Sequence, residues 1–264
     1  MNFDEIIYTK KEGVAKIAIN RPERYNAFTV KTLHEMIQAL EDAWADKSVG
    51  VVVLTGVGQK AFCTGGDQFT RGKGGYGHGG GLDMIEAHSH VIFLIRNIPK
   101  PVIAAVNGYA IGGGHVLHVI CDLTIASETA KFGQVGPRVG SYDAGFGTAF
   151  LARVVGEKRA REIWYLCRQY SAAEAYEMGL VNKVVHPEKL EEEVESLCKE
   201  LLAKSPTALA VLKASFNADT EGLLGISNMA GYSLKLFYDT EESTEGRNAF
   251  TEKRQPNFSK FREG

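Results

Sequence analysis

Residues 62–68 read Phe-Cys-Thr-Gly-Gly-Asp-Gln, and residues 109–115 read Tyr-Ala-Ile-Gly-Gly-Gly-His. An apolar run, 51–54, precedes the first glycine turn, and an apolar helical stretch, 116–120, follows the second. Glycine lets a backbone N–H face a ligand without an intervening side chain, and a helix that begins near Gly113 would point its positive dipole end at the same place. Each turn alone is also explained by the need for a tight bend. Together they predict two amides that can hold a negatively charged oxygen.

The segments around these turns predict an α/β core. Residues 5–9 and 14–19 indicate a strand hairpin, because a Lys-Glu-Gly turn signal separates them. Apolar residues then recur at helical spacing after Thr29, a residue type that favours a helix N-cap. Buried, largely parallel strands are expected at three apolar runs: 51–54, 102–106 and 123–125.

The C-terminal third has a different pattern. Strand signals fade beyond about residue 147, and segments rich in alanine, glutamate and leucine follow at 157–169, 188–203 and 206–217. These segments predict a helical appendage to the α/β core. We expect 1–200 to form the core and 201–264 a helical C-terminal region.

Composition limits the classes of protein to consider. The chain has 264 residues, enough for one large domain with a substantial core, and its 30 basic and 32 acidic residues leave a formal charge of −2. No global field therefore favours a nucleic acid or an anionic membrane as partner. The four cysteines show no CxxC spacing, and the chain shows neither a signal-peptide pattern nor an apolar run long enough for a membrane span. These features predict a cytoplasmic protein without a disulfide framework or a metal site.

Residues 71–81 read Arg-Gly-Lys-Gly-Gly-Tyr-Gly-His-Gly-Gly-Gly. So many glycines predict a mobile surface loop without regular structure. The segment is either a plain connection or a lid that orders over a substrate and delivers Tyr76 or Arg71.

Taken together, these motifs resemble the enoyl-CoA hydratase/isomerase (crotonase) superfamily. The resemblance includes Asn-Arg-Pro at 20–22, Asn-Ala-Phe at 26–28, Pro-Lys-Pro at 99–101 and both glycine turns. It implies an acyl-CoA enzyme with an α/β fold of repeated ββα units, whose helical C-terminal region packs on a neighbouring subunit in trimers and hexamers (dimers of trimers). It also implies that the N–H groups of Gly66 and Gly113 form the oxyanion hole for a thioester enolate.

Longer motifs resemble one lyase branch of this superfamily, the 1,4-dihydroxy-2-naphthoyl-CoA synthases of menaquinone biosynthesis. They lie at 132–137, 140–145, 161–170, 245–250 and 253–256. Ordinary hydratases use paired glutamates, but the second turn here ends in His115 and no such carboxylate is present, which disfavours addition of water to a double bond. Ring closure by a Dieckmann-type condensation needs a base, an oxyanion hole and donors to the attacked carbonyl. The resemblance implies catalytic roles for Ser141, Asp143, Tyr76 and, from a neighbouring subunit, Tyr238.

The same resemblance implies binding residues. Gly136 stands where some relatives carry a catalytic aspartate, and Gln134 and Trp164 match residues that hold a bicarbonate ion, so bicarbonate is expected as the base and no organic cofactor is needed. A Trp164 that is plain core is the alternative. Coenzyme A and substrate contacts are implied for Arg24, Tyr25, Ala27, Thr64, Gly65, Asp67, Gln68, Arg71, Tyr109, Gly112, Val135 and Lys253.

Several positions depart from the synthase pattern. Phe69 stands where the synthases usually carry a basic residue, and the segment 81–90 does not follow the synthase pattern either. The short N-terminus, Val135 and the segment 234–243 are more similar to 2-ketocyclohexanecarboxyl-CoA hydrolases, which open a ring by the reverse reaction. A third alternative is a homologue that binds acyl-CoA or RNA without turnover. His115 and His118 lie at helical spacing but lack a third metal ligand, so packing roles are expected for both.

Overall fold

A computed structural model describes residues 2–72, 75–76, 83–143, 145–220 and 222–262. Its larger sheet has six strands in the order β1-β2-β3-β7-β9-β12, and the second sheet has four in the order β11-β10-β8-β4. In the larger sheet only the β1–β2 pair is antiparallel. The strands of the larger sheet are β1 Ile6–Lys11, β2 Val14–Ile19, β3 Val51–Gly56, β7 Val102–Val106, β9 Leu123–Ser127 and β12 Lys183–Val185.

Successive ββα units build the two sheets together. In the first unit β1 and β2 both join the larger sheet before α1, and in each of the next three the first strand joins the larger sheet and the second joins the smaller one, after which a helix follows. This arrangement confirms the predicted α/β fold of repeated ββα units. The second strands and their helices are β4 Ala61–Cys63 with α2 Met84–Asn97, β8 Tyr109–Ile111 with α3 Gly113–Ile120, and β10 Lys131–Gly133 with α4 Phe146–Val155.

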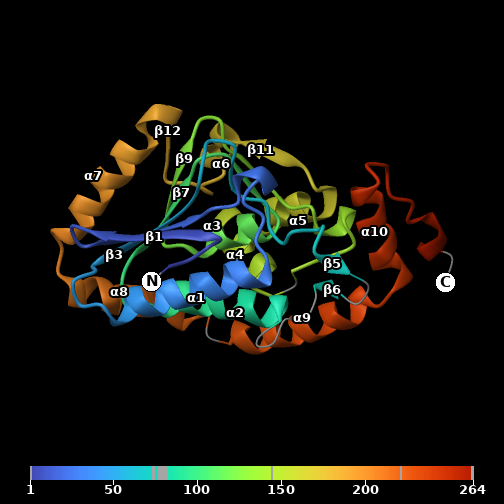
Figure 1. The fold of residues 1–264 in the computed structure, drawn as a ribbon, viewed down its shortest axis with the longest axis horizontal. Coiled ribbons are helices and arrows are strands. Elements are labelled where there is room, and N and C mark those ends of the chain that lie inside the picture. Colours follow the sequence, from blue (N-terminus) through green and yellow to red (C-terminus); the bar gives the residue numbers. More distant parts are fainter. Residues whose placement is uncertain (1, 73–74, 77–82, 144, 221, 263–264) are drawn as a thin grey trace.

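The central strands β3 and β7 of the larger sheet are buried on both faces, which explains why both are nearly continuous apolar runs. Alternate residues of β3 point to opposite sides, so Val52 and Leu54 join the main core while Val51 and Val53 pack against α7 Leu190–Leu202. Helix α1 Val30–Ala45 begins at the predicted N-cap Thr29, which forms a capping box with Thr32. Figure 1 shows α1 and α2 lying side by side along the core.

The C-terminal third is mainly helical, as predicted, but it also supplies two short strands. β11 Gln169–Ser171 and β12 each have three residues, too few to give an alternating pattern, yet both complete a sheet edge. The helices are α5 Glu157–Leu166, α6 Ala172–Glu177, α7, α8 Pro206–Ala218, α9 Leu223–Tyr238 and α10 Glu241–Thr251, and the 3-10 helices are η1 Pro22–Arg24, η2 Gly136–Arg138, η3 Pro187–Lys189 and η4 Ser259–Arg262.

The glycine-rich segment differs from its prediction in part. Arg71–Gly72 (β5) and Gly75–Tyr76 (β6) pair as a minimal antiparallel hairpin next to α9 and α10 (Figure 1). The rest of the expected loop, 73–74 and 77–81, lies outside the described residues. Within the described parts of the chain, no helix combines the length and apolar character that crossing a membrane requires.

Candidate active site

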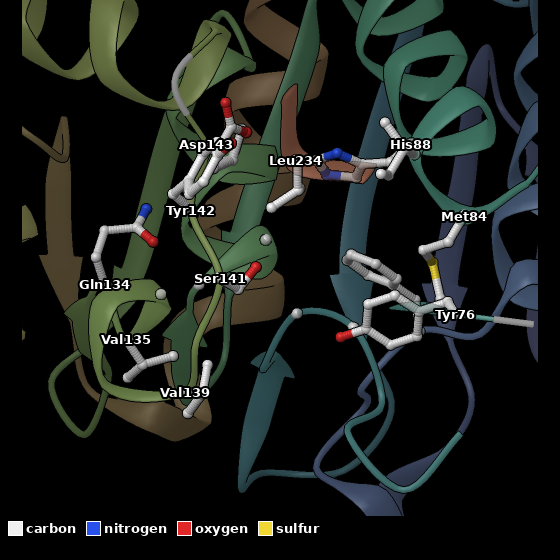
Figure 2. A pocket seen from close by; sticks show the side chains of 18 of the residues that line it. Tyr76, Met84, His88, Gln134, Val135, Val139, Ser141, Tyr142, Asp143 and Leu234 are labelled. Carbon is white, nitrogen blue, oxygen red and sulfur yellow. The ribbon is translucent and has the colours of Figure 1, made fainter. Parts of the chain in front are cut away.

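A cavity of about 140 Å³ opens between the two glycine turns, helix α2 and helix α9. Figure 2 shows its side chains converging from these elements and from the segment that follows β10. The cavity brings together all six predicted catalytic residues, all three predicted anion-binding residues and five of the predicted coenzyme A contacts. These are Gly66, Gly113, Ser141, Asp143, Tyr76 and Tyr238, then Gln134, Gly136 and Trp164, then Thr64, Gly65, Gln68, Gly112 and Val135.

The two glycine turns touch each other at one wall of this cavity. Gly65 has a φ of +84°, and a Cβ there would lie 2.8 Å from the backbone nitrogen of Gly113. Gly113 is the first residue of α3, so its N–H has no acceptor within the helix. Phe28 and Gly66 form a parallel bridge, in which the N–H of Phe28 donates to the carbonyl of Gly65 and the N–H of Asp67 donates to the carbonyl of Phe28. The N–H of Gly66 takes no part in this bridge. Two backbone donors therefore line the same cavity.

Tyr238 enters the cavity from the end of α9. Its hydroxyl shares a 2.9 Å hydrogen bond with the hydroxyl of Ser141, and the guanidinium of Arg71 lies 4.2 Å from the centre of its ring. Burial raises the pKa of Tyr238, so the phenol stays protonated and can donate. In this structure Tyr238 contacts Ser141 of its own chain, and the supply of this tyrosine by a neighbouring subunit stays a prediction.

Tyr76 lies beside the first glycine turn. Its hydroxyl accepts a 2.7 Å hydrogen bond from the amide of Gln68, and its ring meets that of Tyr238 edge to face at 6.1 Å. A Cβ at Gly66 would lie 2.5 Å from the Tyr76 hydroxyl, so this hydroxyl is adjacent to the backbone donors. Burial raises the pKa of Tyr76 as well. The phenols of Tyr76 and Tyr238 therefore both stay neutral in the cavity.

Asp143 is the single carboxylate among the described residues that line the cavity. Its Oδ1 accepts N–H groups from Gly145 and Gly147, each at 3.1 Å, at the start of α4. This leaves Oδ2 outside both bonds. A carboxylate held in this way has a fixed orientation and one oxygen for proton transfer.

The predicted anion-binding residues fit a bicarbonate ion only in part. Gln134 is buried and lines the cavity, with its amide nitrogen 3.4 Å from Nδ1 of His115. The indole N–H of Trp164, however, donates to the carbonyl of Gly147 at 3.1 Å, so the ring forms a wall and its donor is occupied. A Cβ at Gly136 would lie 2.7 Å from the carbonyl oxygen of Ser141. This backbone therefore leaves no room for a side-chain carboxylate at position 136.

Five predicted coenzyme A contacts lie outside the cavity: Arg24, Tyr25, Ala27, Tyr109 and Lys253. Tyr25 and Tyr109 are exposed and meet edge to face at 6.2 Å, while Ala27 is buried and its carbonyl accepts a hydrogen bond from Arg21. Arg24 lies 4.5 Å above the ring of the unexpected Phe69. Phe69 in turn packs against Phe250 of α10 at 6.4 Å, and the exposed Lys253 follows that helix.

The structure places the two remaining predicted contacts inside the protein. Asp67 is buried and pairs with Arg21 at 3.0 Å. Arg71 is also buried and donates to the carbonyls of Val139 and Gly140, at 2.8 and 2.7 Å, and to Ser243. Arg71 thus links β5 to the segment after η2 and to α10. Its guanidinium also packs against the ring of Tyr238.

His88 is among the cavity residues that escaped prediction. His88 lies on α2 between Met84 and Ile92, and these three residues, spaced by four, form the helix face that lines the cavity. Helical periodicity alone would have placed His88 on that face. His115 and His118, by contrast, pack in the core with ring centres 4.8 Å apart, and burial lowers the pKa of His115 to about 3. Within the described ranges, no group of three or more potential ligands could hold a metal ion.

Comparisons with known proteins agree with this geometry. A family model described as enoyl-CoA hydratase/isomerase matches residues 9–261. An enoyl-CoA hydratase from Mycobacterium avium subsp. paratuberculosis K-10 superposes with a TM-score of 0.87 at 29% identity, over 98% of this chain and 100% of that one. A carnitinyl-CoA hydratase from Mycobacterium avium (TM-score 0.84, 30% identity, 97% and 98% coverage) and an enoyl-CoA hydratase from Bacillus anthracis (0.74, 31%, 96% and 98%) are also similar. The chain belongs to the enoyl-CoA hydratase/isomerase (crotonase) family of acyl-CoA enzymes.

Proposed function

We propose that this protein forms a carbon–carbon bond at a thioester enolate, as a ring-closing synthase of the 1,4-dihydroxy-2-naphthoyl-CoA type. The observation that carries this proposal is the donor set of the cavity. One carboxylate, that of Asp143, and the hydrogen-bonded hydroxyls of Ser141 and Tyr238 line a cavity that also has two backbone N–H donors. A hydratase that uses paired carboxylates would need a second one here.

Each group has a distinct task in ring closure. Asp143 takes the proton from the α-carbon, and the amides of Gly66 and Gly113 hold the enolate oxygen. The enolate carbon then attacks the carboxyl carbon at the other end of the substrate, and the hydroxyls of Ser141 and Tyr238 donate to the attacked oxygen. Loss of water leaves the ring ketone. Coenzyme A serves as part of the substrate, and no organic cofactor takes part.

A ring-opening hydrolase of the 2-ketocyclohexanecarboxyl-CoA type is the second candidate. The specific observation in its favour is Phe69, which is 60% exposed where the synthases carry a cation. Arg24 lies over the Phe69 ring, so this cation is engaged with an aromatic surface. A substrate with a free carboxylate gains less from such a surface than a neutral ring ketone does.

Two substrates separate these functions. The protein is incubated with 2-succinylbenzoyl-CoA and, separately, with 2-oxocyclohexanecarbonyl-CoA, and the products are weighed by mass spectrometry. Loss of one water from the first supports ring closure, and gain of one water by the second supports ring opening. Turnover of neither, with retained binding of the thioesters, would indicate a binding protein and reject both proposals.

We predict that bicarbonate assists Asp143 in the abstraction of the α-proton and that turnover therefore depends on it, because Gln134 and Gly136 line the cavity and no side-chain carboxylate fits at position 136. Removal of bicarbonate from the buffer should lower kcat, and its return should restore the rate. The assay compares degassed, bicarbonate-free buffer with the same buffer after addition of the ion, and chloride at equal ionic strength is the control. An unchanged rate would assign α-proton abstraction to Asp143 alone.

Gly75→Ala should lower kcat about 10- to 100-fold, the scale of loss expected when a reacting group is displaced by about 1 Å. Gly75 has a φ of +102°, and a Cβ there would lie 2.6 Å from Cδ2 of Tyr238. The phenol must therefore shift away from Ser141. Gly72→Ala, in the same hairpin, is the matched control, because its nearest atom lies at 3.8 Å. Equal rates for the two variants would remove Tyr238 from the mechanism.

We also propose that the chain assembles as a homohexamer in the cytoplasm. Several large apolar side chains of α8 and α9 are exposed in the single chain, among them Phe216 at 80% and Leu236 at 74%. Apolar surface of this kind favours a protein–protein interface. Sedimentation equilibrium should give six times the 28.8 kDa chain mass. Phe216→Glu should reduce that mass, and a wild-type mass of one chain would contradict the proposal.

A further inference from the structure

His88 and Ser89 are the two polar residues on the face that α2 presents to the cavity. The apolar neighbours of His88 on this face are Met84, Ile85 and Ile92. The imidazole stacks on the ring of Phe28 with centres 5.3 Å apart and planes 23° apart, which fixes its orientation. Figure 2 shows it pointing from α2 toward Leu234 and the side of the cavity that holds Asp143.

The Nε2 atom of His88 is buried and has no hydrogen-bond partner among the described residues. A buried polar atom without a partner is costly, and it marks a place where a ligand or a water can bind. Burial also lowers the pKa of His88, while the negative charge of Asp143 acts in the opposite direction. The ring is therefore neutral near pH 7 and can accept a proton.

We propose that His88 is a catalytic acid and base that transfers the proton of the water consumed or released at the second carbonyl of the substrate. This inference rests on the proposed function, because either direction of that reaction exchanges one water. Asp143, Ser141 and Tyr238 serve the α-carbon and the carbonyl oxygen. None of these three residues is needed to transfer the proton of the water. His88 lines the same cavity from helix α2.

The proton and electron balance is simplest in the direction of ring opening. Neutral His88 takes one proton from water as the water oxygen bonds to the ring ketone carbon. The bond between that carbon and the α-carbon breaks, its electron pair moves into the thioester enolate, and the amides of Gly66 and Gly113 hold the enolate oxygen. The proton on His88 then passes, directly or through Asp143, to the α-carbon. Ring closure follows the same steps backwards and expels water.

The test separates enolate formation from water transfer. Deuterium exchange at the α-carbon of butyryl-CoA, which has no second carbonyl, reports the enolate step alone. Turnover of the ring substrate, measured by mass spectrometry, reports both steps. His88→Phe retains an aromatic ring to stack on Phe28 but removes both nitrogens, and His88→Gln is the second variant should the first unfold.

We expect His88→Phe to exchange deuterium within about twofold of wild type and to lose about 10²- to 10⁴-fold in kcat for the ring substrate. His90→Gln, on the same helix but outside the cavity, should match wild type in both assays. Turnover within threefold of wild type, or equal loss of exchange and turnover, would overturn the role of His88. A wild-type protein that shows neither exchange nor turnover would reject the proposed function, and the role of His88 with it.

Discussion

Asp143→Asn should reduce kcat by about 10²- to 10⁴-fold, the range expected when a positioned general base is lost. Asparagine has nearly the same shape, and its side-chain oxygen can still accept the N–H groups of Gly145 and Gly147 that now bond to Oδ1. The fold at the start of α4 should therefore persist. What disappears is the oxygen that can take a proton from the α-carbon, and initial rates measured under saturating substrate report that loss.

Asp239→Asn provides the control for this variant. Asp239 is exposed and caps α9 one residue beyond Tyr238, so it tests the loss of one negative charge near the site without the loss of a base. Its kcat should equal that of wild type. If Asp143→Asn retains turnover within tenfold of wild type, the base must be another group, and the bicarbonate experiment then decides whether an ion supplies it.

Much of this site could be predicted because its signals are local. The strands 51–54 and 102–106 are apolar on both faces, and the glycines at 65–66 and 112–114 are placed where the backbone needs left-handed φ values or close approach. The structure gives φ values of +84° and +57° to Gly65 and Gly112. The backbone conformation at these positions follows from the residue type, so it can be predicted from one sequence alone.

The remaining features depend on contacts between distant segments. Arg71 is buried because it donates hydrogen bonds to the carbonyls of Val139 and Gly140. These residues are distant from it in the sequence, so no local sequence pattern predicts the contact. Tyr238 reaches Ser141 within one chain because α9 folds back over the cavity. His88 was missed for a different reason, since the spacing from Met84 to Ile92 was visible in the sequence but the ligand-facing side of α2 was not.

Gly113→Ala should lower kcat by about 10²- to 10³-fold, the effect of losing one oxyanion-hole donor. The φ of Gly113 is not positive, so alanine can adopt this backbone conformation. Its Cβ, however, would lie 2.7 Å from Cζ of Phe28 and 3.3 Å from Cα of Gly65. One of the two turns must move by a few tenths of an ångström or more, and the N–H groups of Gly66 and Gly113 then no longer converge on one oxygen.

The ratio of kcat to KM shows whether those amides act on the enolate or merely on the bound thioester. An interaction made only in the transition state lowers kcat and kcat/KM equally, whereas loss of uniform binding raises KM with kcat unchanged. Gly222→Ala is the control, because its Cβ would meet no atom within 4 Å and its φ is −61°. A Gly113→Ala variant with normal kcat and raised KM would show that the glycine turns bind the thioester without stabilising its enolate, and the carbon–carbon chemistry proposed for this cavity would lose its main support.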